Sequence, residues 1–189
     1  MFQIGCVIVL LLLMTCAIHY VLHTMQGKRV TFLIWGIFCA YTAGYLYFTI
    51  LSRQLGSGAF LALRPFQVYA RLFAEPADAG EAAVGFAAKF LNAIPPIVGL
   101  VLNILLYYPL GYLLPILFPK LKPKHVILIG CLCSIATEAT QYLLKMGWCE
   151  TDDVIHNTLG TAIGTGVWYL YSKCFKNRLT KTKGILGNR

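Results

Sequence analysis

Charged residues are scarce in this chain, and acidic residues are the scarcest of them. Only 12% of its 189 residues are Asp, Glu, Lys or Arg, and only 7 are acidic. Hydrophobic residues make up 58% of the sequence, and the mean hydropathy of +0.70 lies far above that of a soluble globular domain. A water-soluble fold would have nowhere to bury so much apolar surface. The composition therefore excludes the soluble classes and predicts an integral membrane protein.

Several sequence signatures of chemistry are also missing. There is no Cys-x-x-Cys pair, no histidine cluster with zinc-ligand spacing, no phosphate-binding loop and no nucleophile motif. Of the 7 cysteines only Cys149 lies in a polar loop, and thiols in apolar runs behave as small hydrophobes. We therefore expect no disulfide, no metal and no cofactor. The net charge of +9 comes from basic residues between and after the apolar runs, which argues against a nucleic-acid partner.

Long apolar runs are what the chain has instead. A spanning helix needs about 20 apolar residues to cross a hydrocarbon core of about 30 Å. The first run has no basic flank before it and no small-residue cleavage site, so we interpret it as a retained helix. The sequence predicts an all-α membrane protein of about five transmembrane helices, at residues 4–25, 30–51, about 92–118, 124–145 and 153–172.

Basic residues predict the direction in which these helices run. Of the 16 Lys and Arg, two lie at residues 28–29, three at 119–124 and six in the tail after Tyr171, while all 7 acids fall on the other side. Basic residues gather on the cytoplasmic side of membrane proteins. We therefore expect a multi-pass cell-membrane protein with its N-terminus outside, a single domain over residues 1–175 and a basic cytoplasmic tail over 176–189.

The connection at residues 52–91 is too polar to span and too apolar to be free coil. We expect it to form an interfacial or re-entrant helix between the second and third spans. Within such a helix Arg64, Gln67 and Arg71 share one face. Two guanidinium groups on that face would hold a ligand, although simple lipid head-group contacts are the plainer interpretation.

Polar residues at membrane depth are costly, and they normally face the bundle interior or a wet cavity. Glu138 is the main case, about 10 Å below the outer end of its predicted helix at 1.5 Å per residue. It belongs to one of three polar stripes that share the spacing i, i+4, i+7 and i+11. The stripes consist of Ser134, Glu138, Gln141 and Lys145; of Asp153, Asn157, Gly160 and Gly164; and of Asn92, Pro96, Gly99 and Asn103.

We expect the three stripes to meet in a pocket that opens toward the outer leaflet. Glycines on one face would let another backbone approach closely and bring the stripes together. The plainer interpretation is that single residues such as Ser134 are interhelical hydrogen-bond glue. His156 points off the stripe, so we expect an interfacial role for it. The candidate binding residues are Arg64, Asn103, Glu138, Gln141, Asp153 and Asn157.

The polar residues named above and a few short motifs around them, taken together, resemble the VanZ-like family of teicoplanin resistance-associated membrane proteins. They run in the family's order from residue 52 to residue 164, and the strongest is the closing GWCETDDVIHNTLGTAIG of residues 147–164. Its Cys149 and Glu150 depart from the family, which often has an aromatic residue and Asp there. The other pieces are Ser52-Arg53, Leu63-Arg64-Pro65-Phe66, Asn103 with Pro109-Leu110-Gly111, and Glu138 with Gln141, and in the closing segment Asp152-Asp153, Asn157, Gly160 and Gly164 match the family's DD, N, G and G.

Three functions compete at this point. The resemblance implies reduced susceptibility to teicoplanin-type lipoglycopeptides, and a non-enzymatic protein would lower drug access to lipid-linked cell-wall precursors; its partners would be membrane lipids, the precursor or the drug. The second function is a membrane enzyme acting on a lipid-linked envelope substrate, with Glu138, Asp152 and Asp153 as acid-base groups. The third is a transporter or channel, which five helices without an internal repeat would form only as an oligomer. The missing nucleophile and phosphate-loop motifs favour the first function over an enzyme.

Overall fold

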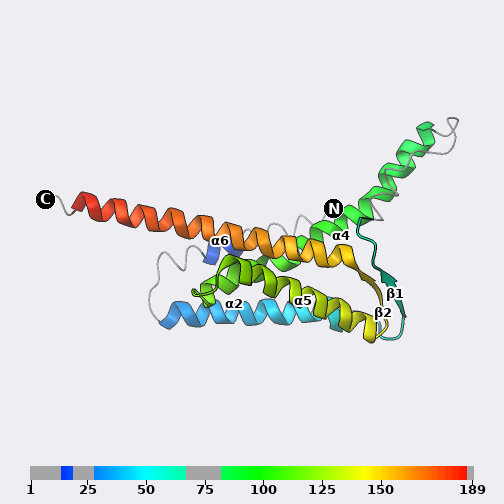
Figure 1. Cartoon of the computed structure of the whole chain (residues 1–189), viewed down its shortest axis with the longest axis horizontal. Coiled ribbons are helices and arrows are strands. Elements are labelled where there is room, and N and C mark those ends of the chain that lie inside the picture. The colour runs from blue at the N-terminus through cyan, green and yellow to red at the C-terminus, as the bar shows by residue number, and fades with distance from the viewer. Residues whose placement is uncertain (1–13, 19–27, 67–81, 187–189) are drawn as a thin grey trace.

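Long helices lying side by side give the molecule its elongated shape (Figure 1). The computed structural model describes the backbone of residues 14–18, 28–66 and 82–186, and the side chains of residues 14–18, 29–66 and 94–174. Residues 14–18 are helical, and the rest of the first expected span, residues 4–25, lies outside the described residues. The long helices are α2 (Lys28–Leu46), which continues into the π-helical segment η1 (Tyr47–Leu51), α4 (Ala82–Leu117), α5 (Pro123–Leu143) and α6 (Thr151–Leu186).

Three described segments are long and apolar enough to cross a membrane: Arg29–Leu51, Ile94–Leu117 and Pro123–Leu143. They confirm the second, third and fourth expected helices, so this is a mainly helical membrane protein. The fifth expected span lies in α6, which is long but too polar to meet the same criterion. The polar side chains of its buried face, such as Thr161 and Thr165, are covered by neighbouring helices. The count of five spans therefore stays a prediction.

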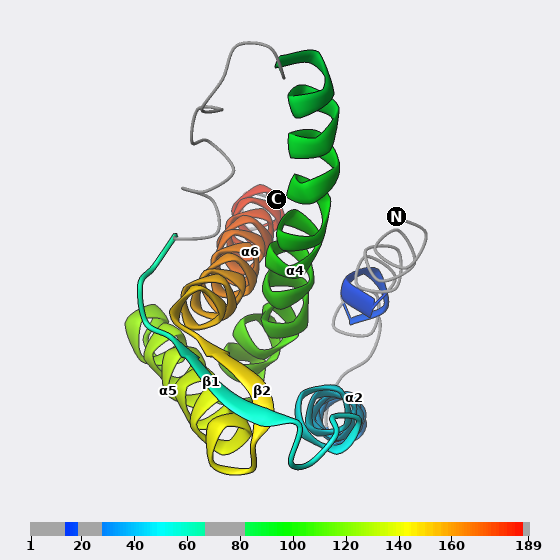
Figure 2. The same ribbon diagram turned by 90° about the vertical axis from the view of Figure 1, so that its right-hand side faces the viewer.

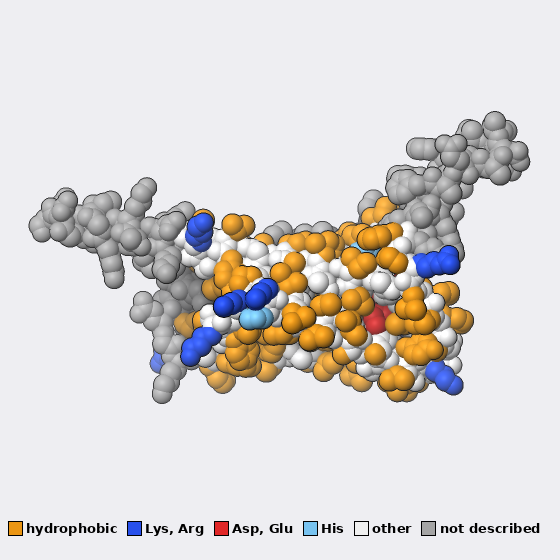
Figure 3. Space-filling view, in the orientation of Figure 1, with side chains coloured by type: hydrophobic (Ala, Val, Ile, Leu, Met, Phe, Trp, Pro, Cys, Tyr) orange, Lys and Arg blue, Asp and Glu red, His pale blue; other side chains and the backbone are white. Residues whose placement is uncertain are grey.

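The interior of the bundle is small, and much of its outer surface is apolar. Tyr107, Tyr112 and Leu113 of α4 are fully buried and form the centre of two adjoining hydrophobic clusters. Large side chains such as Phe32 and Leu132 stay exposed on the outer faces of the helices. Figure 3 shows hydrophobic side chains over much of the visible face, with the basic side chains toward its two ends. A surface of this kind fits lipid around the middle and water or head groups at the ends.

A two-stranded parallel sheet closes one end of the bundle. Strand β1 (Gly58–Ala62) pairs with β2 (Met146–Glu150), in a register that runs from Gly58 opposite Met146 to Ala62 opposite Glu150. Figure 2 shows both strands crossing in front of the helix ends. We call this two-stranded sheet the ribbon and the end that it covers the strand end.

The ribbon corrects the expectation of a helix through residues 52–91. Residues 58–62 form a strand, and Gly56 and Gly58 have positive φ angles of 76° and 120°, which a right-handed helix does not tolerate. The N–H of Gly58 instead donates to the carbonyl of Lys145, 3.2 Å away, so a distant segment satisfies this backbone. Residues 67–81 lie outside the described residues, and α4 begins at Ala82.

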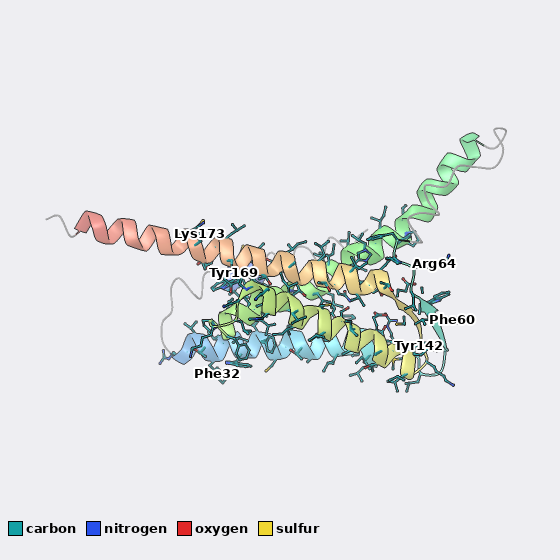
Figure 4. All side chains as sticks on the ribbon, viewed as in Figure 1. Phe32, Phe60, Arg64, Tyr142, Tyr169 and Lys173 are labelled. Atoms are coloured by element: carbon teal, nitrogen blue, oxygen red, sulfur yellow. The ribbon has the colours of Figure 1, made fainter. Side chains whose placement is uncertain are left out.

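The end of the bundle opposite the ribbon contains the connection between α4 and α5, residues 118–122, and the beginning of α2. Trp35 and Phe118 stack edge to face, and the Tyr169 hydroxyl donates to the Leu121 carbonyl at 2.7 Å. Figure 4 shows Phe32, Tyr169 and Lys173 toward this end and Phe60, Arg64 and Tyr142 toward the strand end. Helix α6 runs on without a break past the expected boundary between residues 175 and 176.

Candidate functional site

Glycines allow α4 and α6 to touch backbone to backbone. A Cβ atom on Gly160 would lie 2.2 Å from the carbonyl oxygen of Ile104, and one on Gly164 would lie 2.1 Å from that of Tyr108. Any side chain at these positions would push the helices apart. The glycine face predicted from the sequence does therefore support a close helix contact. Its partner is α4, whereas the sequence pattern was interpreted as bringing Asp153 and Asn157 to the Glu138 stripe of α5.

This close contact brings Asn103 of α4 to Asp153 of α6. The Asn103 Nδ2 atom donates a hydrogen bond to the Asp153 carboxylate at 2.6 Å. One turn further along the same face of α6, the Asn157 Nδ2 atom donates to the Ser134 hydroxyl of α5 at 2.8 Å. The single interhelical hydrogen bonds expected for Asn103 and Ser134 are thus present. Members of all three predicted stripes contact one another through α6.

Glu138 lies deep beside the ribbon. Its side chain is only 4% exposed, and its Oε2 atom accepts the backbone N–H of Glu150, at the end of β2, at 3.0 Å. Glu138 also interacts electrostatically with the Asp153 carboxylate and with the Arg53 guanidinium, and Arg53 acts on Asp153 as well. The charge of exposed Arg53, in the segment after η1, therefore acts on a carboxylate of α5 and on one of α6. We call Arg53, Asn103, Ser134, Glu138, Gln141, Asp153 and Asn157 the polar cluster.

Two amide oxygens in the cluster have acceptor capacity to spare. The Gln141 Nε2 atom donates to the Thr49 carbonyl at 2.9 Å, which ties α5 to η1. Gln141 and Asn157 are only 2% and 4% exposed. Nevertheless, Gln141 Oε1 and Asn157 Oδ1 accept no hydrogen bond from the described residues. Buried carbonyl oxygens in folded proteins are nearly always paired. A water molecule or the donor group of a ligand would satisfy them.

Asp152 is placed differently from Asp153, its neighbour in sequence. Its carboxylate accepts the backbone N–H of Phe66 at 2.7 Å, and the neighbouring Thr151 hydroxyl donates to the Leu63 carbonyl at 3.2 Å. Both bonds fasten the segment after β1 to the first turn of α6. Asp152 therefore binds the segment that follows β1, while Asp153 binds Asn103 in the polar cluster.

Cys149 and Glu150 line the cluster from β2. Burial and the neighbouring Glu138 carboxylate raise the pKa of the Cys149 thiol, so Cys149 is protonated at neutral pH and is a poor nucleophile. Burial, together with the charges of Asp153 and Asp152, raises the pKa of the Glu150 carboxyl. In the described part of the chain, no three or more His, Cys, Asp or Glu side chains are grouped in a way that would hold a metal ion.

Arg64 does not join the cluster as the sequence interpretation required. It lies in the bend that follows β1, with its side chain exposed, and Figure 4 shows it beside the strand end. The prediction of a helical face shared with Gln67 and Arg71 is wrong at Arg64, because Arg64 lies in a bend after a strand and not in a helix. Gln67 and Arg71 themselves lie outside the described residues.

Sequence reasoning overlooked Arg53 and the backbone of Glu150 as members of the site. Arg53 had two signals in the sequence: it follows an apolar span almost directly, and with Ser52 it is one of the pieces that resemble the family. Nothing in the sequence showed that it approaches Glu138, because that depends on how η1, α5 and α6 pack. The N–H of Glu150 carries no sequence signal at all, since every residue except proline has one.

A comparison with family models decides the relationship of the chain. The VanZ/LLP1 family model matches residues 29–172. This protein belongs to the VanZ/LLP1 family. The matched region runs from α2 to the middle of α6, so it includes the ribbon and every member of the polar cluster. No curated protein and no solved structure matches the chain significantly.

Proposed function

We propose that this VanZ-type membrane protein lowers the access of teicoplanin-type lipoglycopeptides to lipid-linked cell-wall precursors in the bacterial envelope. One observation supports this function above the others: two carboxylates, three amides and a guanidinium gather toward one end of a bundle whose outer surface is largely apolar. Lipid-linked precursors carry their phosphates and sugars at that level of a bilayer. A polar site there is suited to a head group that water and lipid both surround.

The chemistry of the cluster fits such a head group. The carboxylates of Glu138 and Asp153 would accept hydrogen bonds from hydroxyl or ammonium groups, and the spare oxygens of Gln141 and Asn157 would add to them. A guanidinium, from Arg53 or from exposed Arg64, pairs with phosphate through two parallel hydrogen bonds. The proposed action needs only binding, so it requires no nucleophile.

We further propose that the strand end faces outward, with the N-terminus outside and the C-terminus in the cytoplasm. The basic tail after Tyr171 supports this direction through the positive-inside bias. The ribbon supports placing the connection after η1 and the connection after α5 on the same side of the membrane, because it pairs these two segments. Cysteine labelling of intact cells at exposed Lys145, replaced in a variant without native cysteines, would test this; label excluded until the cells are opened would reverse the assignment.

The functional test compares wild type with Glu138→Gln in a susceptible bacterium. We expect the wild type to reduce surface-bound fluorescent teicoplanin while precursor masses stay unchanged, and Glu138→Gln to restore drug binding. Glu75→Gln makes the same chemical change at an acid that is not a member of the polar cluster, so it is the matched control and should behave like wild type. A precursor of altered mass would contradict the proposal, and full protection by Glu138→Gln at equal expression would remove Glu138 from it.

The pairing of Glu138 with Asp153 favours one alternative, a membrane enzyme that modifies a lipid-linked envelope substrate. In this alternative Glu138 acts as the general base and Asp153 tunes it electrostatically. Asp152 fits this role less well, since its carboxylate binds the Phe66 N–H. Purified protein incubated with extracted lipid intermediates would decide the matter: turnover that Glu138→Gln abolishes supports the enzyme, and unchanged lipids exclude it.

A further inference from the structure

The outer face of the ribbon carries a pair of stacked aromatic rings. Phe60 lies opposite Trp148 in the register, and their ring centroids are 4.9 Å apart with an interplanar angle of 23°. Side chains alternate between the two faces of a strand. Cys149, the next residue of β2, interacts with Glu138 inside the bundle, so Trp148 points the other way. Phe60 and Trp148 are accordingly 48% and 55% exposed.

More apolar side chains surround this pair. Leu63 and Phe66, which follow β1, are 64% and 53% exposed. We call Phe60, Leu63, Phe66 and Trp148 the strand-end patch. Contiguous exposed apolar patches are rare on surfaces that face only water. The patch therefore needs a covering partner.

The apolar surface of the spans leads directly to this patch. Leu51 ends one candidate span and is 73% exposed, and Leu143 ends another and is 76% exposed. Both face the surroundings that the spans themselves face, and the ribbon begins a few residues beyond each. An exposed apolar patch that follows two lipid-facing span ends so closely in the chain has the same partner as those spans.

Charge at the edge of the patch identifies the level of that partner. Arg53, Arg64 and Lys145 are all exposed around the ribbon, and basic side chains at the ends of spans contact lipid phosphates. Tryptophan is enriched at the same level. The hydrocarbon core is excluded, because a two-stranded sheet has two open edges whose backbone groups need water or head groups.

We propose that the β1–β2 ribbon is seated in the head-group layer of the bilayer, with the strand-end patch on the upper acyl chains and Arg53, Arg64 and Lys145 at the lipid phosphates. The bilayer thus forms one wall around the polar cluster, because the same ribbon holds Glu138 through the Glu150 N–H. A lipid-linked head group would reach the carboxylates sideways from the membrane. The seating of the ribbon does not depend on the proposed function.

The test measures the depth of Trp148 in the full-length protein. In a Trp35→Phe, Trp168→Phe variant reconstituted into phosphatidylcholine vesicles, Trp148 is the only tryptophan. We expect bromines placed high on the acyl chains to quench it more strongly than bromines near the bilayer centre, with weak quenching by aqueous iodide. The depth control carries Leu132→Trp in a background without the native tryptophans, since Leu132 is exposed in the middle of a candidate span and should show the reverse order.

Three other results would overturn the proposal. Strong quenching by iodide with none by brominated lipid would place the ribbon in water. Strongest quenching by the deepest bromines would place it in the hydrocarbon core. Protection from both quenchers would show that a second protein surface, including another copy of this chain, covers the patch. A misfolded variant is recognised separately, because the thermal transition of the unsubstituted protein would be lost.

Discussion

The contact between α4 and α6 gives the sharpest prediction, because one helix offers both a test position and a control. A methyl group on Gly160 would lie 2.2 Å from the Ile104 carbonyl oxygen, more than 1 Å short of ordinary contact, which begins at 3.4 Å. The obstacle is a helix backbone, which cannot rotate away as a side chain can. On Gly166 the same methyl group meets no atom within 4 Å. Gly160→Ala and Gly166→Ala therefore differ only in the space available.

Both variants gain helix propensity, but only Gly160→Ala also has the cost of overpacking. Replacing helical glycine by alanine contributes roughly 1 kcal/mol of helix propensity, and overpacking costs roughly 1–3 kcal/mol or more. We expect Gly166→Ala to be neutral or stabilising, and Gly160→Ala to lower the free energy of unfolding by up to about 2 kcal/mol. For a chain of this size that corresponds to a lower thermal midpoint by several degrees, at about 2–4 °C per kcal/mol.

Thermal unfolding in detergent, followed by circular dichroism, measures both variants under one condition. Equal midpoints for Gly160→Ala and Gly166→Ala would refute the close approach of α4 and α6. They would also undermine the polar cluster, since the hydrogen bond between Asn103 and Asp153 depends on that approach.

Three further predictions follow from individual contacts. A double-mutant cycle of Asn103→Ala and Asp153→Ala should give a coupling of about 0.6 kcal/mol, the average for interhelical hydrogen bonds in a membrane protein, and at most about 1.7 kcal/mol; additive effects would dismiss the bond. Asp152→Ala should abolish the hydrogen-exchange protection of the Phe66 N–H while Asp152→Asn keeps it, and unchanged exchange in both would show that the bond does not hold this segment. Burial raises the pKa of Glu150 above its ordinary 4.5, so the unfolded chain releases this proton first, and stability falls as pH rises from about 4.5 through the raised pKa. Glu150→Gln should therefore make the thermal midpoint fall less between pH 4 and 7. An unchanged pH profile would count against this role of Glu150.

The family assignment and the polar cluster drew on different parts of the sequence. The segment from Gly147 to Gly164 supplied most of the resemblance, and it also supplied the glycine face that packs on α4. The predicted stripes named Asn103, Glu138, Asp153 and Asn157, and the structure joins each of them to a neighbouring element. Arg64 was named for a helical face that does not form at its position, and Arg53 approaches the carboxylates instead.

The amino-acid sequence by itself determined where the long helices lie and which of their faces are polar. Each helical hydrogen bond closes within four residues, and burial follows a period of 3.6 residues, so both are visible in a short window of sequence. Only the tertiary structure decided the ribbon, whose strands are 88 positions apart, and with it the partner of Glu138 and the approach of Arg53. Strand pairing and charge proximity depend on which distant segments meet in space, and no local pattern records that.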